Sequence, residues 1–434
     1  MRSSLSFKDF IVFITGCTGA GKSDLGVEIA KQFNGEIINA DSMQIYKGLD
    51  IVTNKITEEE MCGIPHHLMS FYSPDKMEYH VHTFRESAIR IINEIWARNH
   101  LPIVVGGTAY YMEALLYQNH LIETSSQQLG WFCFLRLQFI TLFLDDVQSK
   151  LSNMDSDEAY EMLLQVDPES AAQVHRNNTY RVKRALEIFM TSGKRKSEWL
   201  KDQQTQNENI GVNIRFSKSL VISLDANVKV LDNRINARVG KMLNLGLREE
   251  LEAFYDQYHD ILPAKYGVLQ SIGLKEFLPY LQLNKTEQLT IKGENLLQNG
   301  CEEIKVHTRQ YARRQRKYIR KLIRRASEDK KPPILLLDTS DDFYGQAVPM
   351  AIKSVETFLS GNELSLDEGI PLAEFLLESP TYYDYQVEAN RIFTCDLCKL
   401  EIHGYQMYQN HLNGKKHKSK LKTLRTSDPD DLAC

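Results

Sequence analysis

The sequence has little cysteine and no visible targeting segment. Its 434 residues include seven cysteines, of which only Cys395 and Cys398 lie close together. Cysteines scattered along a long chain argue against a disulfide framework and indicate a reducing compartment. The first apolar run, at residues 10–14, is too short for a signal peptide, and a glycine-rich loop follows it. We therefore expect a cytoplasmic protein, with mitochondrial and nuclear pools left open.

A long hydrophobic run is also missing. The most apolar stretch, residues 131–144 (WFCFLRLQFITLFL), contains Arg136 and is shorter than the roughly 20 apolar residues that a membrane-spanning helix needs. We interpret it as a buried helix or strand and expect no membrane partner. The sequence also has no internal repeat, which argues against a solenoid. The expected oligomeric state is a monomer.

Positive charge is scarce overall but concentrated in one segment. The net charge is −5, yet residues 305–331 contain twelve Lys or Arg and two acids. Such a basic stripe is the electrostatic footprint of a polyanion partner. Four arginines recur on one face of the expected helix, where they could follow a phosphate backbone: Arg309, Arg313, Arg316 and Arg320. A nuclear localisation signal or a plain solvated face is the alternative.

Short apolar runs alternate with helical patterns in the first quarter of the chain. Residues 10–15, 36–40 and 101–105 are typical of buried strands, whereas residues 23–33 and 82–98 have helical spacing. This alternation predicts an α/β fold with a doubly wound parallel sheet of the P-loop type. In such a sheet, ligands bind at the carboxyl ends of the strands.

Residues 16–23 (GCTGAGKS) fit the pattern G-x-x-x-x-G-K-[ST] between a predicted strand and a predicted helix. The glycines let backbone N–H groups surround phosphate oxygens, and the helix N-terminus adds its positive end. Lys22 would neutralise the outer phosphate, and the Ser23 hydroxyl would hold Mg²⁺. Asp41 and Asp225, which end two apolar runs, are candidate carboxylates for the same ion.

The P-loop predicts a polyphosphate but does not identify the molecule that carries it. By itself the motif also fits an ATP-dependent kinase of nucleosides or small molecules. However, the sequence has no run of four apolar residues followed by Asp-Glu, and no arginine-rich lid of the nucleoside-kinase type. The kinase is the first alternative.

Four residues late in the sequence have the spacing of a C2H2 zinc finger: Cys395, Cys398, His411 and His417. Two thiolates and two imidazoles form a closed tetrahedral site, which predicts structural rather than catalytic Zn²⁺. Phe393, Tyr405 and Leu412 are expected to form the small core of the finger. The lysines that follow indicate contact with nucleic acid.

These patterns divide the chain into six segments. The predicted division is a first part of the P-loop core at 1–118, a helical insertion at 119–201, a second part of the core with the basic helix at 202–331, a linker at 332–385, the zinc finger at 386–424 and a tail at 425–434. In the second part of the core we expect a strand at residues 219–224 and one long helix at residues 228–254.

Five motifs resemble the tRNA dimethylallyltransferase, or isopentenyltransferase, family and occur in the family's order. They are residues 16–23 (GCTGAGKS), 37–46 (IINADSMQIY), 106–111 (GGTAYY), 234–242 (RINARVGKM) with Gly246-Leu247, and 270–276 (QSIGLKE). The likeness covers most of residues 10–320, and the matrin-like finger is typical of the eukaryotic members. Residues 127–150 depart from the polar helical pattern of the family. Because they lie at the entrance to the helical insertion, this difference is expected to affect tRNA docking more than diphosphate binding.

The resemblance implies that the P-loop binds dimethylallyl diphosphate and that the dimethylallyl group moves to N6 of adenosine 37 in the tRNA anticodon loop. Asp41 would accept the proton of the adenine amine. Thr18 would contact the diphosphate near the scissile oxygen, and Arg234 would stabilise the leaving group. The implied diphosphate-binding residues are Gly16, Thr18, Gly19, Ala20, Gly21, Lys22, Ser23 and Arg238.

The resemblance also implies which residues contact tRNA, whose target base must leave its stack. They are Asp41, Ser42, Met43, Gln44, Thr108, Tyr180, Arg181, Lys183, Arg184, Gln270, Ile272, Gly273, Lys275, Arg309, Arg313 and Arg316. A tRNA-binding protein that has lost catalysis is the second alternative. The presence of Asp41, Thr18, Lys22 and Arg234 argues against that loss.

Overall fold

A computed structural model describes residues 6–76, 79–118, 121–122, 146–147, 149–151, 153–210, 213–264, 267–324, 332–362, 392–403 and 405–427. Contacts divide the chain into two compact units, Met1–His120 with Ile210–Leu376 and Leu121–Asn209 with Leu377–Cys434. The apolar stretch at residues 131–144 lies outside the described residues. No helix within the described ranges is long and apolar enough to cross a membrane.

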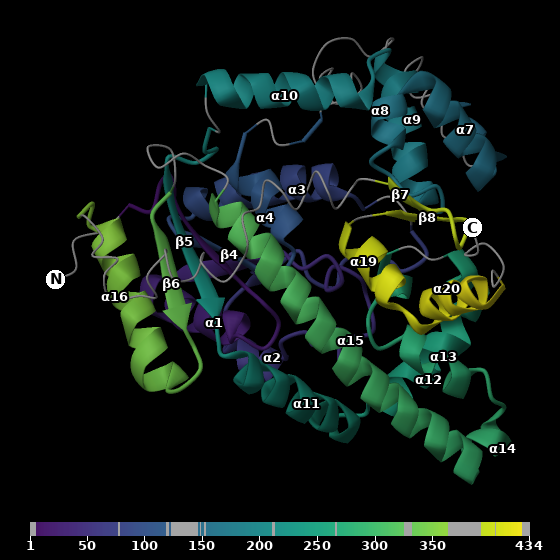
Figure 1. The fold of residues 1–434 in the computed structure, drawn as a ribbon. Helices are drawn as coiled ribbons and strands as arrows, with labels where there is room; N and C mark the ends of the chain where they lie inside the picture. Colours follow the sequence, from purple (N-terminus) through teal and green to yellow (C-terminus); the bar gives the residue numbers. More distant parts are fainter. Residues whose placement is uncertain are drawn as a thin grey trace. The chain divides into compact units, whose positions relative to one another are not determined.

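The first unit is built on a six-stranded parallel sheet with the strand order β3-β2-β4-β1-β5-β6. Its strands are β1 (Phe10–Gly16), β2 (Gly35–Asn39), β3 (His66–His67), β4 (Leu101–Gly106), β5 (Lys218–Asp225) and β6 (Ile334–Asp338). Strands β4, β5 and β6 of this sheet are labelled in Figure 1. Parallel neighbours need crossover connections, and helices supply most of them. The sheet confirms the predicted α/β fold class.

Helices pack on both faces of this sheet. The helices of the first unit are α1 (Lys22–Phe33), α2 (Glu58–Met61), α3 (Val81–Ala97), α4 (Ala109–Leu116), α11 (Val228–Asn244), α12 (Leu247–Tyr258), α13 (Leu278–Leu281), α14 (Lys285–Gln288), α15 (Ile291–Arg324) and α16 (Val348–Leu359). Alternate residues of β1 point to opposite faces. Ile11 and Phe13 join the apolar cluster of α3 and α4, whereas Val12 and Ile14 join that of α1 and α16.

The single helix predicted at residues 228–254 is wrong, because the segment forms two helices, α11 and α12. Gly246 lies between them with a φ of 96°, a left-handed conformation that favours glycine. Met242 and Leu247 are buried on either side of it. The apolar pattern therefore continues across the break, which is why periodicity alone did not predict it.

The predicted linker at residues 332–385 is wrong for the part that the structure describes. Strand β6 pairs with β5 in the register Val221↔Ile334 to Asp225↔Asp338, and α16 packs on the sheet after it. A short strand buried on both faces has no polar alternation, so its leucine run carried no strand periodicity. Residues 363–385 lie outside the described ranges.

The insertion in the second unit is helical, as expected. Its described helices are α7 (Ser156–Val166), α8 (Pro168–Ala171), α9 (Thr179–Ser192) and α10 (Lys196–Ile210). Ala159 and Leu163 of α7 pack against Val182 and Leu186 of α9 in a small apolar core. Helix α10 continues past residue 201, so the predicted start of the second part of the core at residue 202 is too early.

The terminal segment forms a small ββα element. It consists of β7 (Ile392–Cys395), β8 (Leu400–His403), α19 (Tyr405–Asn413) and α20 (Lys415–Ser427). The two strands pair antiparallel, and Phe393 stacks on Tyr408 at a centroid distance of 5.1 Å. The side chain of Tyr405 lies outside the described residues. Helix α20 continues past residue 424, where the finger was predicted to end.

Candidate active site

The P-loop lies where β1 ends and α1 begins. Gly21, the N-cap of α1, has a φ of 87°, which a residue with a side chain rarely adopts. Having no side chain, it leaves the first N–H groups of α1 facing the loop, where an anion can accept them. Nζ of Lys22 lies across the loop and donates to the backbone carbonyl of Cys17 at 2.9 Å. Ser23 follows on the exposed side of the first turn.

Two arginines of α11 contact P-loop residues Thr18 and Gly19. Arg238 donates from Nη1 to the Thr18 hydroxyl at 2.8 Å. Arg234, one helical turn earlier, donates to the carbonyl of Gly19 at 3.3 Å and to the carbonyl of Thr339, the residue after β6. Both arginines are half-buried. The structure thus brings the two predicted arginines to the loop that should hold diphosphate.

Asp41 lies two residues beyond the end of β2, at the same edge of the sheet as the P-loop. Its Oδ1 accepts the backbone N–H of Met43 at 2.9 Å. Burial raises the pKa of Asp41, although the Met43 N–H and the charge of Lys22 oppose the rise. Burial likewise lowers the pKa of Lys22, and the charges of Cys17 and Asp41 oppose that shift. The Asp41 carboxylate and the Lys22 ammonium therefore interact electrostatically across the site.

The segment after Asp41 is tied to the segment after β4. Thr108 Oγ1 accepts the backbone N–H of Ser42 at 3.1 Å and donates to the Ser42 hydroxyl at 3.3 Å. The backbone N–H of Thr108 in turn donates to the carbonyl of Ala40 at 3.3 Å. Asp41, Ser42 and Thr108 are thereby held together, as expected for residues around one substrate.

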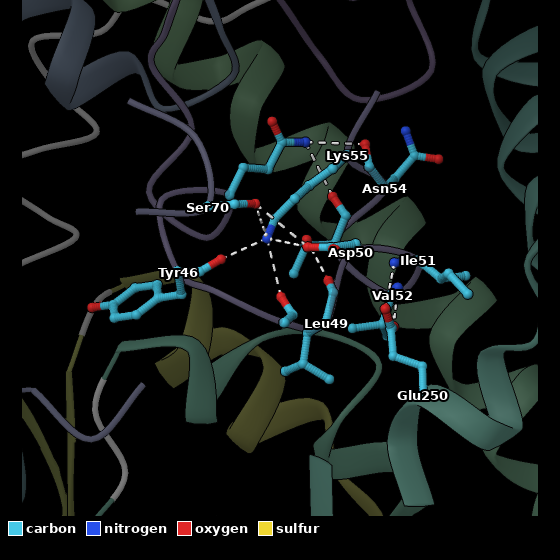
Figure 2. Close-up of polar contacts among 12 residues, drawn as sticks. Tyr46, Leu49, Asp50, Ile51, Val52, Asn54, Lys55, Ser70 and Glu250 are labelled. Atoms are coloured by element: carbon cyan, nitrogen blue, oxygen red, sulfur yellow. Dashed lines mark hydrogen bonds and ion pairs between the residues drawn. The ribbon is translucent and has the colours of Figure 1, made fainter. Parts of the chain in front are cut away.

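The loop that continues from this segment is held by a buried lysine (Figure 2). Nζ of Lys55 donates to the carbonyls of Tyr46 and Gly48, to a carboxylate oxygen of Asp50 and to the Ser70 hydroxyl. The Lys55 side chain is only 3% exposed. These four acceptors close the loop around one ammonium group.

Two further side chains fasten the same loop (Figure 2). Gln44 donates from Nε2 to the carbonyls of Thr53 and Asn54, at 3.1 Å each. Glu250 of α12 accepts the backbone N–H groups of Ile51 and Val52 at 2.8 and 2.9 Å. Gln44 is therefore engaged with its own loop, in addition to any contact with RNA.

Asp225 is not suited to be the Mg²⁺ ligand considered above. One of its carboxylate oxygens pairs with Arg316 at 2.8 Å, and the other accepts the backbone N–H of Ala226 at 2.9 Å. Burial raises the pKa of Asp225, and Arg316 opposes the rise. This carboxylate ties α15 to β5 and also accepts the Cys17 thiol of the P-loop at 3.9 Å, so both of its oxygens already have protein partners.

The arginines of α15 also hold partners on the core. Arg309 donates to the Asn236 side chain and Arg313 to Asp232 at 3.2 Å, both on α11, while Arg316 pairs with Asp225. Arg313 is exposed, whereas Arg309 and Arg316 are half-buried. The face that the periodicity predicted as a phosphate track is therefore largely the packing face of the helix.

Sequence patterns missed two residues of α15 that reach the site. Gln315 accepts the N–H of Thr18 at 2.9 Å and donates to the carbonyl of Gly107 at 3.0 Å. Tyr311, one turn earlier, hydrogen-bonds Gln315 and Thr108. Burial chiefly raises the pKa of Tyr311, and the Asp41 carboxylate adds to the rise. In the sequence, Gln315 is one uncharged polar residue within a strongly basic helix, and nothing in that pattern indicates that it is buried.

The remaining predicted tRNA-binding residues lie in two places. In the first unit, Gln270 and Lys275 are exposed, Ile272 is half-buried, and the N–H of Gly273 donates to Glu276. In the second unit, near the start of α9, Tyr180 is 75% exposed and Arg181 is exposed. Lys183 and Arg184 follow on α9, both half-buried. These residues divide between the two units.

The four predicted zinc ligands come together in the terminal element. Their candidate donor atoms all lie within 4.8 Å of one another. Nδ1 of His417 lies 3.5 Å from both cysteine sulfurs and 3.2 Å from Nε2 of His411. With the usual Zn–S and Zn–N bond lengths, a tetrahedral site has S···N and N···N edges of about 3.6 and 3.3 Å. The donor set and its spacing fit Zn²⁺.

The parallel sheet has a P-loop after β1 and a half-buried aspartate, Asp41, after β2. This arrangement defines a doubly wound P-loop protein. Comparison with known proteins narrows this class. A family model described as IPP transferase matches residues 44–322. The tRNA dimethylallyltransferase of Mus musculus is 35% identical over 434 residues, covering 98% of this chain and 88% of that protein. The chain belongs to the IPP transferase family.

Other relatives agree. The tRNA dimethylallyltransferase of Saccharomyces cerevisiae is 33% identical, covering 97% of this chain and 94% of that protein. A solved structure of a eukaryotic dimethylallyltransferase acting on tRNA has a TM-score of 0.73 and 31% identity, and the match covers 96% of this chain and 98% of that one. The tRNA isopentenylpyrophosphate transferase from Bacillus halodurans has a TM-score of 0.51 at 28% identity, with 82% and 98% covered.

Proposed function

We propose that the chain transfers the dimethylallyl group of dimethylallyl diphosphate to N6 of adenosine 37 in the anticodon loop of tRNA. The observation that carries this proposal is a half-buried carboxylate, Asp41, at the same edge of the sheet as a P-loop whose Thr18 hydroxyl is held by Arg238. Family membership and the names of the relatives support the choice of substrates.

In the proposed reaction, N6 attacks C1 of the dimethylallyl group as the C1–O bond to diphosphate breaks. Negative charge grows on the leaving diphosphate, and donors placed around it in advance lower the barrier. Lys22 and the first N–H groups of α1 serve that purpose. Arg238 acts next to Thr18, whose hydroxyl it already holds. Arg234 braces the loop through Gly19 and Thr339 and adds positive charge.

Asp41 takes the proton from N6 as the new N–C bond forms. An exocyclic adenine amine is a poor nucleophile, because its lone pair is delocalised into the ring, so a hydrogen-bonded base must orient it. A carboxylate that burial has made more basic accepts the proton more readily than an ordinary aspartate. The loop of residues 42–44 and Thr108 would surround the flipped base.

Mg²⁺ fits this site with Ser23 as its protein ligand. Ser23 lies in the first turn of α1, and it is exposed. Mg²⁺ commonly completes its coordination with substrate phosphates and water. When bound, the ion would neutralise charge on the diphosphate. In the terminal element, Cys395, Cys398, His411 and His417 would hold Zn²⁺ as a structural ion, and the lysines of α20 would contact tRNA.

Transfer of labelled dimethylallyl from its diphosphate to unmodified tRNA tests the proposal. Label is expected on N6 of adenosine 37 with the wild-type chain and at background level with Asp41→Ala. tRNA binding without transfer would instead indicate a protein that has lost catalysis. ATP consumption without transfer or tRNA binding would indicate a kinase. Either result contradicts the proposal.

A further inference from the structure

Gln315 is a buried amide that joins the two halves of the site. The residue is 4% exposed and lies on α15. Its Oε1 accepts the backbone N–H of Thr18 in the P-loop, and its Nε2 donates to the backbone carbonyl of Gly107 beyond β4. One planar group therefore fixes the separation between the P-loop and the segment that presents Thr108.

A side chain at Gly107 would displace this amide. A Cβ at Gly107 would lie 2.3 Å from Nε2 of Gln315, a distance that side chains essentially never show, whereas the next atoms are at 3.5 and 3.7 Å. Its φ lies outside the left-handed region, so the backbone itself accepts an alanine. An alanine at position 107 therefore clashes with the Gln315 amide at its hydrogen-bonding position, whereas its other neighbours leave room for a Cβ.

Each end of the bridge is also bonded to a residue assigned to the reaction. Thr18 is held by Arg238 on the diphosphate side, and Thr108 holds Ser42 next to Asp41 on the adenine side. The attacking nitrogen and the carbon must approach to roughly 3–3.5 Å in line, and a misplacement of about 1 Å can cost on the order of a hundredfold in rate.

We propose that Gln315 is a positioning residue that sets the distance between the bound diphosphate and the adenine amine. It acts through the backbone groups of Thr18 and Gly107, and Tyr311 hydrogen-bonds the same amide. Glutamate cannot replace it, because a carboxylate accepts from Thr18 but has no proton for the Gly107 carbonyl. This inference rests on the proposed transfer reaction.

Single-turnover transfer by the full chain, with both substrates saturating, separates the rate constant from the fraction of active enzyme. We expect Gln315→Ala to lower the rate constant by about tenfold or more, with amplitude and tRNA affinity within about twofold of wild type. Gln288→Ala is the matched control, since it removes an equally buried amide from α14 and should leave the rate constant unchanged. An unchanged rate constant for Gln315→Ala, or a loss of amplitude alone, would overturn the inference.

A second substitution tests the contact itself. Gly107→Ala should lower the rate constant by about tenfold in the wild-type background and by less than about twofold in the Gln315→Ala background, because the clash is then gone. Equal losses in both backgrounds would contradict the proposed geometry. If the wild-type chain transfers nothing, the proposed function fails as well; if it is active and Gln315→Ala matches it, only this inference fails.

Discussion

Asp41 occupies a position that disfavours the charge it needs. Burial raises its pKa, so ionised Asp41 costs folding free energy at neutral pH. Neutral asparagine can still accept the Met43 N–H at the same place. The folded chain should therefore be less stable with aspartate than with asparagine at position 41. Such a loss of stability in exchange for reactivity is common at active sites.

Asp41→Asn should therefore abolish transfer while leaving the chain equally or more resistant to heat. For the wild type, kcat/KM should fall as the pH drops through the raised pKa of Asp41, above the ordinary value of about 3.9. A pH–rate profile and a thermal melt of both proteins check the two statements. An acid limb at or below the ordinary aspartate value would contradict the assignment of the base.

Glu36 is the opposite case, a carboxylate whose charge the fold favours. Its side chain is 4% exposed and is bonded by Arg98, His67 and His100. Burial pushes its pKa up, but these three partners outweigh burial and lower the pKa to about 2. The cluster ties β2 and the edge strand β3 to the end of α3.

Glu36→Gln should lower the free energy of unfolding at pH 7 by roughly 2 kcal/mol, because the Arg98 guanidinium loses the negative charge that it pairs with. A depressed pKa stabilises the fold above the unfolded value of about 4.3, and that contribution is lost as the pH falls toward about 2. Denaturant titrations at several pH values should therefore show the variant and wild type converging below pH 4. A difference independent of pH would contradict this account.

Elements as well as single residues arrange the site, and the loop of residues 44–55 is the clearest example. It begins beside Asp41 and returns to the core at Lys55, whose ammonium group collects three acceptors from the loop and one from Ser70 (Figure 2). Glu250 holds the far side of the loop. The loop is ordered by buried polar contacts more than by a regular helix or strand.

Lys55→Met should loosen this loop and lower kcat by about tenfold, because buried carbonyls lose their donor and Asp41 loses its support. Lys55→Arg should not restore activity, since a planar guanidinium cannot reproduce contacts made by a compact ammonium. Steady-state transfer and limited proteolysis of the loop check this. Lys47→Met, which removes an exposed charge from the same loop, is the control and should behave as wild type.

How far the sequence predicted these elements depends on the kind of signal each one carries. The P-loop, Asp41 and the two arginines of α11 belong to motifs with a fixed local geometry, and the structure brings them together. Gln315 acts through a contact between segments about 300 residues apart in the chain, which no local pattern encodes. Strand β6 has too few residues for a periodicity to show. Gly246 belongs to one of the family motifs, but only its backbone conformation shows that it separates two helices.

At the scale of the whole molecule, the terminal element carries its own ligand set. The donor atoms of the four predicted ligands all come from residues 395–417, so metal binding and folding of this element should be one event. The P-loop sheet has its own apolar clusters on both faces. The two should therefore respond separately to loss of metal.

Cys398→Ala should remove one equivalent of zinc, weaken tRNA binding and leave the binding of dimethylallyl diphosphate and the melting of the core unchanged. Cys62→Ala, an exposed cysteine outside the cluster, is the matched control and should retain its zinc. Metal analysis of the purified proteins and titrations with each substrate check these outcomes. Loss of diphosphate binding together with zinc would show that the finger supports the catalytic core directly.

The late position of β6 has a consequence for how the chain is made. Arg234 is braced by Thr339, and β5 has an unpaired edge until residues 334–338 are synthesised. At roughly 5–20 residues per second, a ribosome needs on the order of ten seconds between the end of β5 and this strand. During that time the nascent chain exposes an apolar parallel edge, the feature most prone to wrong pairing. A message truncated just before residue 332 would encode all five family motifs but not β6. The resulting chain could not complete its sheet and would depend on chaperones.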